Sequence, residues 1–401
     1  MFKVDTSSQK INDFLERGVK DIITRESVSK KLASGQVLRV KHGVDPSGNE
    51  LHLGHASVYL KLRDLQEMGH KIVFLIGGFT GRFGDPTERV KTRTLKSKEE
   101  TAENAQNYIK QIAKILDVKE LEIRTNNEWY DQMSAEELVR LMSSFTADQV
   151  LERDMFQERK KKNESIQLHE LVYPILQGYD SVMLKSNLTV IGSDQVFNEN
   201  FGRELQKKNG QAPQDIVAIS ILRGLDGTQK MGKSLGNYIS ITASAENQFG
   251  QIMSLPDSLI VDYFTLLTRA PLKEIEDMAV DLAAGKVNPK NLKIKLAQEI
   301  VSFFHSQKAS TDAAVNFEKV FSKKEAPTEL AAIKTGLDKL KLIDLVVASN
   351  LTMSKTEARR LIEDGAVDIN NETETNPNKI VDLKSEIILK VGKHRFVKLS
   401  R

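Results

Sequence analysis

The stretch VKHGVDPSGNELHLGH, residues 40 to 55, decides how the rest of the chain is organised. Its first residues, through Val44, have the character of a buried strand, and the turn formers Pro46 and Gly48 end that strand. A helix then begins near His52, so the stretch is strand, turn and helix start. The unpaired N–H groups and the positive dipole at such a helix start favour anions. The stretch therefore predicts a nucleotide site at the carboxyl end of a strand.

Two histidines mark the start of this helix. His52 and His55 are three residues apart, so they share one helix face. Gly54 lies between them and lets a flat base approach the backbone. Two other interpretations stay open: the histidines merely line a surface, or they bind zinc, for which the sequence offers no third ligand at a helical spacing.

The following segments predict a parallel sheet. Strands are expected at 38–44 and 71–79, joined by the helix that starts at His52 and ends at Gly69, which makes a β-α-β unit. A second glycine-rich loop follows the second strand, at the sheet edge where ligands bind. Further elements are expected as follows: strands at 188–192 and 216–222, and helices within 1–35, 97–160, 165–182 and 244–321.

Composition limits the class of protein without deciding it. The chain has 401 residues, enough for roughly two or three domains. Lys and Arg number 58 against 55 Asp and Glu, so a nucleic acid would need local basic faces. There is no cysteine, which excludes disulfides, thiolate zinc sites and a cysteine nucleophile. The longest apolar run, residues 72–76, is too short for a membrane span, and we expect no signal peptide.

A second motif, Lys230-Met-Gly-Lys-Ser234, lies on a loop flanked by Gly227 and Gly236. Two lysines three residues apart on such a loop can close over a polyphosphate and neutralise the charge that develops on leaving pyrophosphate. The alternative interpretation is an exposed basic turn, which is the usual meaning of an isolated Lys-x-x-Lys.

Together these motifs resemble the two ATP signatures of class I aminoacyl-tRNA synthetases. The segments between them are similar to those of bacterial tyrosyl-tRNA synthetases. These segments are Gly43-Val-Asp45-Pro, Gly81-x-x-Gly84-Asp85-Pro86, Tyr173-Pro-x-x-Gln177-Gly-Tyr-Asp180-Ser, Gly192-Ser-Asp194-Gln195-x-x-Asn198 and Gly224-Leu-Asp-Gly227. The resemblance covers almost the whole chain, and residues 342–397 are similar to an S4 RNA-binding domain.

The resemblance implies an α/β fold class with a Rossmann-like parallel-sheet catalytic domain, an α-helical domain and a small α+β S4 RNA-binding domain. The implied boundaries are 1–240 for the catalytic domain, with a helical insertion at about 125–165, 241–325 for an α-helical anticodon-binding domain, 326–338 for a linker and 339–401 for the S4-like domain. The implied function is that of a tyrosine–tRNA ligase. The protein would be a cytoplasmic homodimer with no membrane association. Its partners would be ATP, L-tyrosine and tRNA(Tyr), and its cofactor Mg²⁺ bound with ATP.

The residues of the amino-acid pocket also follow a physical pattern. Tyr173, Gln177 and Asp180 have i, i+4 and i+7 spacing and share a helix face, with Pro174 expected at the first helical position and Tyr173 as its cap. A substrate phenol needs a polar partner, and an α-ammonium needs acidic or amide oxygens, which this face supplies. The alternative is a polar stripe facing solvent.

The resemblance assigns roles to individual residues, with no resident metal site. Catalytic stabilisation of phosphate charge is expected from His52, His55, Lys230 and Lys233. Tyrosine binding is expected from Lys41, Asp85, Tyr173, Gln177, Asp180 and Gln195, with Asp180 on the substrate hydroxyl. ATP binding is expected from Asp45, Ser47, Gly54, Gly192, Asp194 and Ser234, and tRNA binding from Lys355, Arg359 and Arg360.

Four positions depart from the usual family pattern. Lys41 stands where one bacterial branch has a tyrosine, although a second branch, which this chain resembles more closely, also has Val-Lys there. Gly232 replaces the first serine of Lys-Met-Ser-Lys-Ser, Ile191 a glycine, and Ser47 a threonine. None of these changes removes a charged group. Two rival functions are a related synthetase of the tryptophanyl type and an RNA-binding protein that has lost catalysis, for which Gly232 and Ile191 are the only hints.

Overall fold

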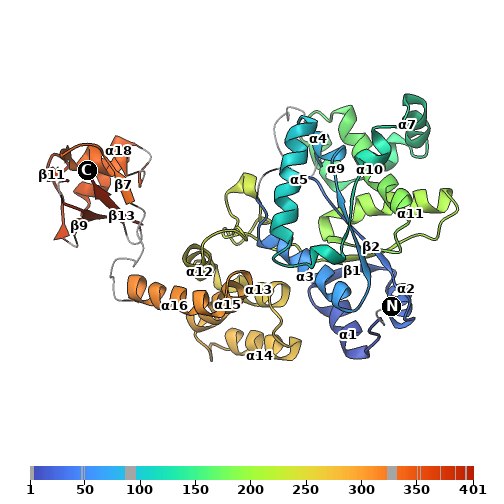
Figure 1. Ribbon diagram of the computed structural model, residues 1–401, viewed down its shortest axis with the longest axis horizontal. Helices are drawn as coiled ribbons and strands as arrows, with labels where there is room; N and C mark the ends of the chain where they lie inside the picture. The colour runs from blue at the N-terminus through green and yellow to red at the C-terminus, as the bar shows by residue number, and fades with distance from the viewer. Residues whose placement is uncertain are drawn as a thin grey trace. The chain divides into compact units, whose positions relative to one another are not determined.

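The computed structural model describes residues 4–46, 48, 50–85, 96–322, 332–349, 351–352, 354–370, 372–383, 385–392 and 395–401. The chain forms two compact units (Figure 1). The larger unit comprises Met1–Ser244 and Gln251–Phe304, and the smaller unit comprises Ala245–Gly250 and His305–Arg401.

A six-stranded sheet forms the centre of the larger unit, in the order β1-β6-β5-β2-β3-β4. Its strands are β1 (Val19–Ile23), β2 (Arg39–Val44), β3 (Lys71–Ile76), β4 (Glu122–Thr125), β5 (Leu188–Gly192) and β6 (Asp215–Ile219). Only β1 runs antiparallel to its neighbour. Strand β2 pairs with β3 on one side and β5 on the other, which makes the topological switch point where ligands of α/β sheets bind.

Helices cover both faces of this sheet. Val73 and Leu75 of β3 belong to the apolar cluster of α10 (Leu168–Leu184) and α11 (Val196–Lys208). Phe74, between them, contacts Tyr59 of α3 (Leu53–Glu67), at 5.8 Å between ring centroids. Because successive strand residues face opposite sides, α3 and the α10–α11 pair lie on opposite faces. The α/β fold class is therefore confirmed.

Further helices of the described chain precede the small sheets of the C-terminal region, and the last of them, α16, belongs to the smaller unit. They are α1 (Ser8–Glu16), α2 (Arg25–Ala33), α4 (Thr80–Phe83), α5 (Lys98–Ile112), α6 (Asn127–Tyr130), α7 (Ala135–Met142), α8 (Ala147–Leu151), α9 (Asp154–Lys161), α12 (Ala245–Met253), α13 (Ile260–Leu267), α14 (Leu272–Ala283), α15 (Pro289–Phe304) and α16 (Gln307–Ser322). Helix α12 spans the division between the two units.

Two predicted helical regions contain strands. Residues 19–23, expected within a helical segment, form β1, and residues 122–125, expected among helices, form β4. Both are short edge strands whose pairing comes from distant segments, such as Ile22 opposite Val217, and local periodicity does not report such pairing. These two predictions were wrong.

Helix α10 also begins earlier than predicted. It starts at Leu168 after a reciprocal capping box between Gln167 and Glu170, so Pro174 lies inside the helix and Tyr173 is not a cap. An interior proline sacrifices one backbone hydrogen bond, and here the buried face of α10 outweighs that cost. The predicted alignment of Tyr173, Gln177 and Asp180 on one helix survives this correction.

The smaller unit contains a five-stranded sheet, β10-β9-β12-β13-β7, and a two-stranded sheet, β11-β8. Its elements are β7 (Ala332–Lys334), β8 (Lys339–Lys341), α17 (Leu342–Ala348), α18 (Lys355–Glu363), β9 (Val367–Ile369), β10 (Glu372–Thr373), β11 (Ile380–Asp382), β12 (Ile387–Val391) and β13 (Arg395–Ser400). Because β7 pairs with β13, the sheet begins inside the expected linker at 326–338. Residues 326–331 of that expected linker lie outside the described residues.

Local residues set both ends of α18. Ser354 caps the helix, its side chain accepting a hydrogen bond from the Glu357 N–H at 3.2 Å. Gly365 follows the helix with φ of 67°, a conformation that favours glycine.

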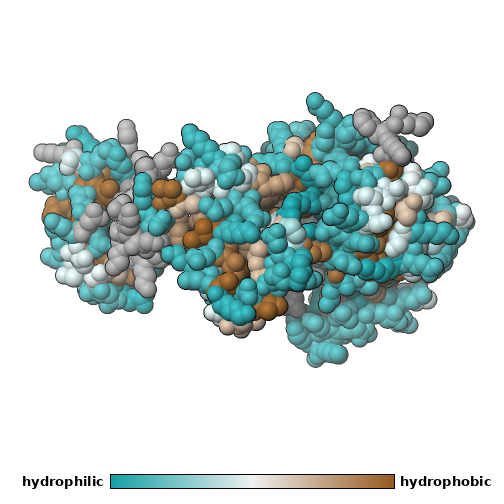
Figure 2. Space-filling model, turned by 90° about the horizontal axis from the view of Figure 1, so that it is seen from below, coloured by the Kyte–Doolittle hydropathy of each residue, from teal (hydrophilic) through white to brown (hydrophobic). Residues whose placement is uncertain are grey.

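The surface seen in Figure 2 is mostly hydrophilic, with hydrophobic residues in small separate patches. Among the described residues, no helix combines the length and apolar character that crossing a membrane requires.

The apolar core of the smaller unit provides a test of this architecture. Leu389 of β12 is fully buried in that core. Leu389→Ala should lower the unfolding free energy of the smaller unit by about 2–5 kcal/mol, because it removes buried methyl groups and leaves a cavity. Hydrogen exchange should report faster opening of β9, β12 and β13 and unchanged exchange in β2 and β3.

Leu337→Ala is the matched control, since Leu337 is 52% exposed. A loss of stability as large as that of Leu389→Ala, or equal acceleration of exchange in both units, would contradict the independent core.

Candidate active site

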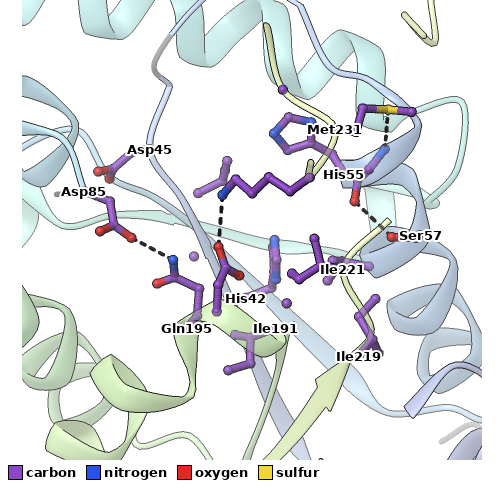
Figure 3. A pocket seen from close by; sticks show the side chains of 18 of the residues that line it. His42, Asp45, His55, Ser57, Asp85, Ile191, Gln195, Ile219, Ile221 and Met231 are labelled. Atoms are coloured by element: carbon purple, nitrogen blue, oxygen red, sulfur yellow. Dashed lines mark hydrogen bonds and ion pairs between the residues drawn. The ribbon is translucent and has the colours of Figure 1, made fainter. Parts of the chain in front are cut away.

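A cavity of about 810 Å³ opens at the carboxyl ends of β2, β3, β5 and β6. Asp45, Asp85 and Gln195 lie on one side of it, and Ile219, Ile221 and Met231 lie on the other (Figure 3). One part of the cavity therefore suits a charged ligand, and the other a flat apolar group.

The structure brings the predicted catalytic and ligand-binding residues together. All those that it describes line this cavity: Lys41, Asp45, His52, Gly54, His55, Asp85, Tyr173, Gln177, Asp180, Gly192, Asp194, Gln195, Lys230, Lys233 and Ser234. Ser47 lies outside the described residues. Ile191 also lines the cavity, as a buried residue of β5.

The two histidines interact at the start of α3. His52 is the N-cap residue, its backbone N–H donates to His55 Nδ1 at 3.3 Å, and the ring centroids are 3.9 Å apart. Burial, and then the charge of Lys233, lowers the pKa of His52 to about 3. Burial also lowers the pKa of His55 well below its usual value. Both rings are therefore neutral at neutral pH and act through hydrogen bonds and dipoles.

Gly54 is required by close approach of its neighbours. A Cβ atom there would lie 2.9 Å from His52 Nδ1 and 3.5 Å from Met231 Cβ. The Gly54 N–H donates to the Met231 sulfur at 3.3 Å, as Figure 3 shows. The missing side chain thus allows the His52 ring and Met231 to pack against the helix start.

Both signature lysines lie beside the cavity with protein partners. Lys230 Nζ is 3.0 Å from Asp194 Oδ2. Lys233 Nζ donates to the Glu50 carbonyl oxygen at 3.0 Å and to the Tyr108 hydroxyl at 3.2 Å. Each ammonium is thus held beside the cavity by oxygen atoms that a phosphate could replace.

Asn237 holds the loop that carries these lysines. Its Oδ1 accepts from the Gly232 N–H at 2.9 Å, and its Nδ2 donates to Asp226 Oδ2 at 2.6 Å and to the Lys230 carbonyl at 3.1 Å. A Cβ at Gly224 would lie 2.3 Å from Asn237 Cγ, which explains the glycine there. At Gly232, by contrast, the nearest atom to a Cβ would be 3.9 Å away, so a serine would fit.

Asp180 is almost completely buried, with 3% of its surface exposed. Trp129 Nε1 donates to Oδ1 at 3.0 Å, and Asn126 Nδ2 donates to Oδ2 at 3.4 Å. Burial raises the pKa of Asp180 to about 7, although the Lys41 charge and these donors oppose the shift. Asp180 thus lies near the midpoint of its titration at neutral pH.

Asp45 and Asp85, two further acids of the cavity, are also fixed by hydrogen bonds. The Tyr173 hydroxyl donates to Asp45 Oδ2 at 2.7 Å, and Thr80 donates to Asp45 Oδ1 at 2.8 Å. Gln195 Nε2 donates to Asp85 Oδ2 at 2.7 Å, as Figure 3 shows. Burial and the Asp45 charge raise the pKa of Tyr173 well above its usual value, so its hydroxyl stays a donor.

Several residues of the site were not singled out in the sequence. They are Thr80, Tyr108, Asn126, Trp129, Arg153, Glu199 and Asn237, of which Arg153 lies 3.4 Å from Asp85 and Glu199 3.0 Å from Lys41. Most orient another side chain of the site, and no short motif marks such a role. Glu199 directly follows Asn198 of the motif Gly192-Ser-Asp194-Gln195-x-x-Asn198. This adjacency is the only feature of the sequence that could have pointed to Glu199 as a residue of the site.

The predicted tRNA-binding residues lie elsewhere, on α18 of the smaller unit. Lys355, Arg359 and Arg360 are exposed, whereas Ala358 and Ile362 are buried in its core. Lys355 lies 2.7 Å from Asp344. In the described part of the chain, no group of three or more His, Asp or Glu side chains is placed to hold a metal ion.

Comparison with known proteins agrees with this geometry. Residues 33–322 match the family model described as class I tRNA synthetases for tryptophan and tyrosine. The tyrosine–tRNA ligase of Moorella thermoacetica is 40% identical over 99% of this chain and 97% of its own length, and that of Thermotoga maritima is 42% identical over 96% of each chain. The chain belongs to the family of bacterial tyrosyl-tRNA synthetases.

Residues 317–398 match the tyrosine–tRNA ligase SYY-like C-terminal domain, so the smaller unit carries the C-terminal domain of this family. Tyrosyl-tRNA synthetases of known structure share the fold. The L-tyrosine complex of the Archaeoglobus fulgidus enzyme has a TM-score of 0.62 at 24% identity, covering 77% of this chain and 100% of that one. The truncated mitochondrial enzyme of Aspergillus nidulans has a TM-score of 0.63 at 20% identity, covering 78% and 94%.

The hydrogen bonds of Asn237 predict that its side chain stabilises the loop that carries Lys230 and Lys233. Asn237→Ala should release the Gly232 N–H and the Lys230 carbonyl, and hydrogen exchange of residues 230–237 should accelerate about tenfold, which corresponds to the loss of about one hydrogen bond. Gln229→Ala is the control, because the exposed Gln229 contacts the same loop through its backbone. Equal hydrogen-exchange rates of residues 230–237 in the two variants would show that the Asn237 side chain does not hold this loop.

Proposed function

We propose that the protein is a tyrosine–tRNA ligase, which activates L-tyrosine with ATP to give tyrosyl-adenylate and pyrophosphate and then transfers the tyrosyl group to the 3′ end of tRNA(Tyr). One observation carries the proposal. A single cavity joins a buried acceptor for a phenol, Asp180, to two histidines and two lysines suited to phosphate.

The polar side of the cavity is the proposed tyrosine pocket. Asp180 accepts the hydrogen bond of the substrate hydroxyl, and Trp129 and Asn126 hold the carboxylate for it. Asp85 and Gln177 then provide oxygen atoms for the α-ammonium group, together with the oxygen lone pairs of Tyr173. Phenylalanine would leave the buried Asp180 without the hydrogen bond of the substrate hydroxyl, and tyrosyl-tRNA synthetases are themselves the established example of this kind of discrimination.

The opposite side of the cavity is proposed to hold ATP, with Mg²⁺ as its counter-ion. Ile219, Ile221 and Met231 offer apolar surface to the adenine ring. Asp194 accepts hydrogen bonds from the ribose, and Lys230, released from Asp194, moves to the phosphates. Gly54, Gly192 and Ser234 complete the nucleotide side, and Asp45 is proposed to contact ATP from the polar side of the cavity.

Catalysis is proposed to consist of positioning and charge stabilisation. An oxygen of the tyrosine carboxylate attacks the α-phosphorus in line, the carboxylate–phosphorus bond forms, and the bond to pyrophosphate breaks. Neutral His52 and His55 donate hydrogen bonds to phosphate oxygens, while Lys230 and Lys233 neutralise charge on the leaving pyrophosphate. The terminal ribose hydroxyl of tRNA then attacks the acyl carbon, and AMP leaves, without a covalent enzyme intermediate.

The partners beyond the cavity are also proposals. Lys355, Arg359 and Arg360 of the C-terminal domain are proposed to contact tRNA phosphates, because all three are exposed on one short helix. A homodimer is proposed to cover exposed apolar residues of the neighbouring helices α7 and α10, namely Leu168, Val139 and Met142, exposed by 82%, 64% and 36%. A cytoplasmic location is proposed because the tRNA substrate is used there.

Amino-acid-dependent exchange of pyrophosphate into ATP tests the function. Among a panel of amino acids, we expect exchange with tyrosine alone, and none with phenylalanine or tryptophan, because neither offers a phenol to Asp180. Exchange with tryptophan would identify the tryptophanyl type instead. A protein that binds tRNA but exchanges with no amino acid would be an RNA-binding protein without catalysis.

The pKa of Asp180 predicts how tyrosine binding depends on pH. An ionised carboxylate accepts a stronger hydrogen bond than its protonated form, so protonation of Asp180 below about pH 7 should weaken binding. The KM for tyrosine should rise between pH 8 and 6, by up to about tenfold per unit below the pKa. Nearby Tyr130 stays protonated, because burial raises its pKa well above the usual value.

Asp180→Asn provides the control for this titration. It should have a high KM for tyrosine at every pH, without the rise between pH 8 and 6. The same pH dependence in Asp180→Asn and in the unchanged protein would exclude Asp180 as the titrating group.

A further inference from the structure

Lys41 and Glu199 form an ion pair in the part of the cavity that Gln177 and Asp180 also line. Lys41 Nζ lies 3.0 Å from each carboxylate oxygen of Glu199, and the two side chains are only 1% and 2% exposed. The Ser181 hydroxyl, at 2.8 Å, and the Gln177 carbonyl, at 3.3 Å, also accept from this ammonium. All three N–H bonds of Lys41 therefore have partners within the protein.

Glu199 also accepts hydrogen bonds from two amide side chains. Gln177 Nε2 lies 2.9 Å from Oε1, and Gln214 Nε2 lies 2.7 Å from Oε2. An ionised carboxylate accepts and does not donate, so Gln177 must present its NH₂ group and turn its side-chain oxygen the other way. The buried charge thus selects one of the two orientations open to a glutamine amide.

The orientation of the Gln177 amide also fixes the orientations of two neighbouring amides, because hydrogen bonds connect the three side chains. Gln177 Oε1 accepts from Asn198 Nδ2 at 2.8 Å, and the same Nδ2 donates to Gln195 Oε1 at 3.1 Å. Gln195 in turn directs its Nε2 to Asp85. Reversing any one of these amides would place two donors or two acceptors opposite each other, so the orientations are linked.

We propose that the Lys41–Glu199 pair is the positioning element of the tyrosine pocket, holding Gln177, and through it Asn198 and Gln195, in the one arrangement that receives the amino-acid end of the substrate. The inference rests on the proposed function and assigns Lys41 a role through Gln177, in place of direct contact with the substrate.

The energetics of buried ion pairs support a positioning role. Desolvating both charges offsets most of their attraction, so a buried pair often stabilises a fold no more than apolar residues would. What apolar residues cannot do is orient an amide. The pair therefore orients the Gln177 amide. The loss of Lys41 or Glu199 alone would leave an uncompensated charge in the core.

The test replaces both charges together, so that the variant keeps its fold. Lys41→Met with Glu199→Gln is compared with Gln177→Ala and with all three substitutions combined, in the full-length chain. Measurements are tyrosine binding by calorimetry, the KM values for tyrosine and ATP in pyrophosphate exchange, and the thermal midpoint.

We expect the double variant to raise the KM and the dissociation constant for tyrosine by about tenfold or more, with the KM for ATP within about twofold of the unchanged protein. In the Gln177→Ala background the same two substitutions should add less than about twofold, because the pair acts through Gln177.

Arg39→Met with Glu122→Gln is the matched control. Arg39 lies two residues before Lys41 on β2, and it contacts Glu122 through two hydrogen bonds of 2.8 Å outside the cavity. This variant should keep the tyrosine KM of the unchanged protein.

Three results would overturn the positioning role. They are an unchanged tyrosine affinity in the folded Lys41–Glu199 variant, an equal loss of tyrosine and ATP affinity, or full additivity with Gln177→Ala. Tyrosine binding to the unchanged protein without any exchange would contradict only the proposed function, and absence of tyrosine binding would contradict both.

Discussion

The pairing of β2 with β3 on one side and with β5 on the other is the constraint on which the site depends. Because these strands are parallel, their carboxyl ends meet at one edge of the sheet. The loop after β2 brings Asp45 and the two histidines there, the loop after β3 brings Asp85, and the loop after β5 brings Asp194. Residues separated by more than a hundred positions thus share one cavity.

Charge in this cavity is arranged so that almost every ionisable group has a fixed partner. Asp45 is held by Tyr173 and Thr80, and Lys230 by Asp194. These partners lie within the protein and hold the side chains in place before any ligand binds. The two histidines complete this arrangement, because burial keeps their rings neutral beside the positive lysines.

Close packing requires some glycines of the site but not others. At Gly54 and Gly224 a side chain would collide with the His52 ring and with Asn237, so these glycines are needed for close approach. Gly232 has no such neighbour, although it lies in the signature loop. The serine expected there would therefore fit, and the glycine costs the loop only a hydroxyl group and some conformational restriction.

The sequence by itself determined the α/β class, the main strands and part of the lining of the cavity. The class and the strands follow from local patterns, namely apolar runs for buried strands and turn residues at their ends. The two histidines and two lysines follow from motif spacing, whereas Asp85, Asp194 and Gln195 were expected only from the family resemblance. The N-cap at Ser354 and the face shared by Tyr173, Gln177 and Asp180 are of the same kind, since each depends only on neighbours along one helix.

Only the tertiary structure decided what orients those residues. The edge strands β1 and β4 exist because distant strands pair with them, and the start of α10 before Pro174 depends on the packing of its buried face. The roles of Glu199 and Asn237 arise in the same way, from contacts between segments far apart or between a side chain and a folded loop. Hydrogen bonds that position a side chain depend on ångström-scale placement, which no residue pattern along the chain encodes.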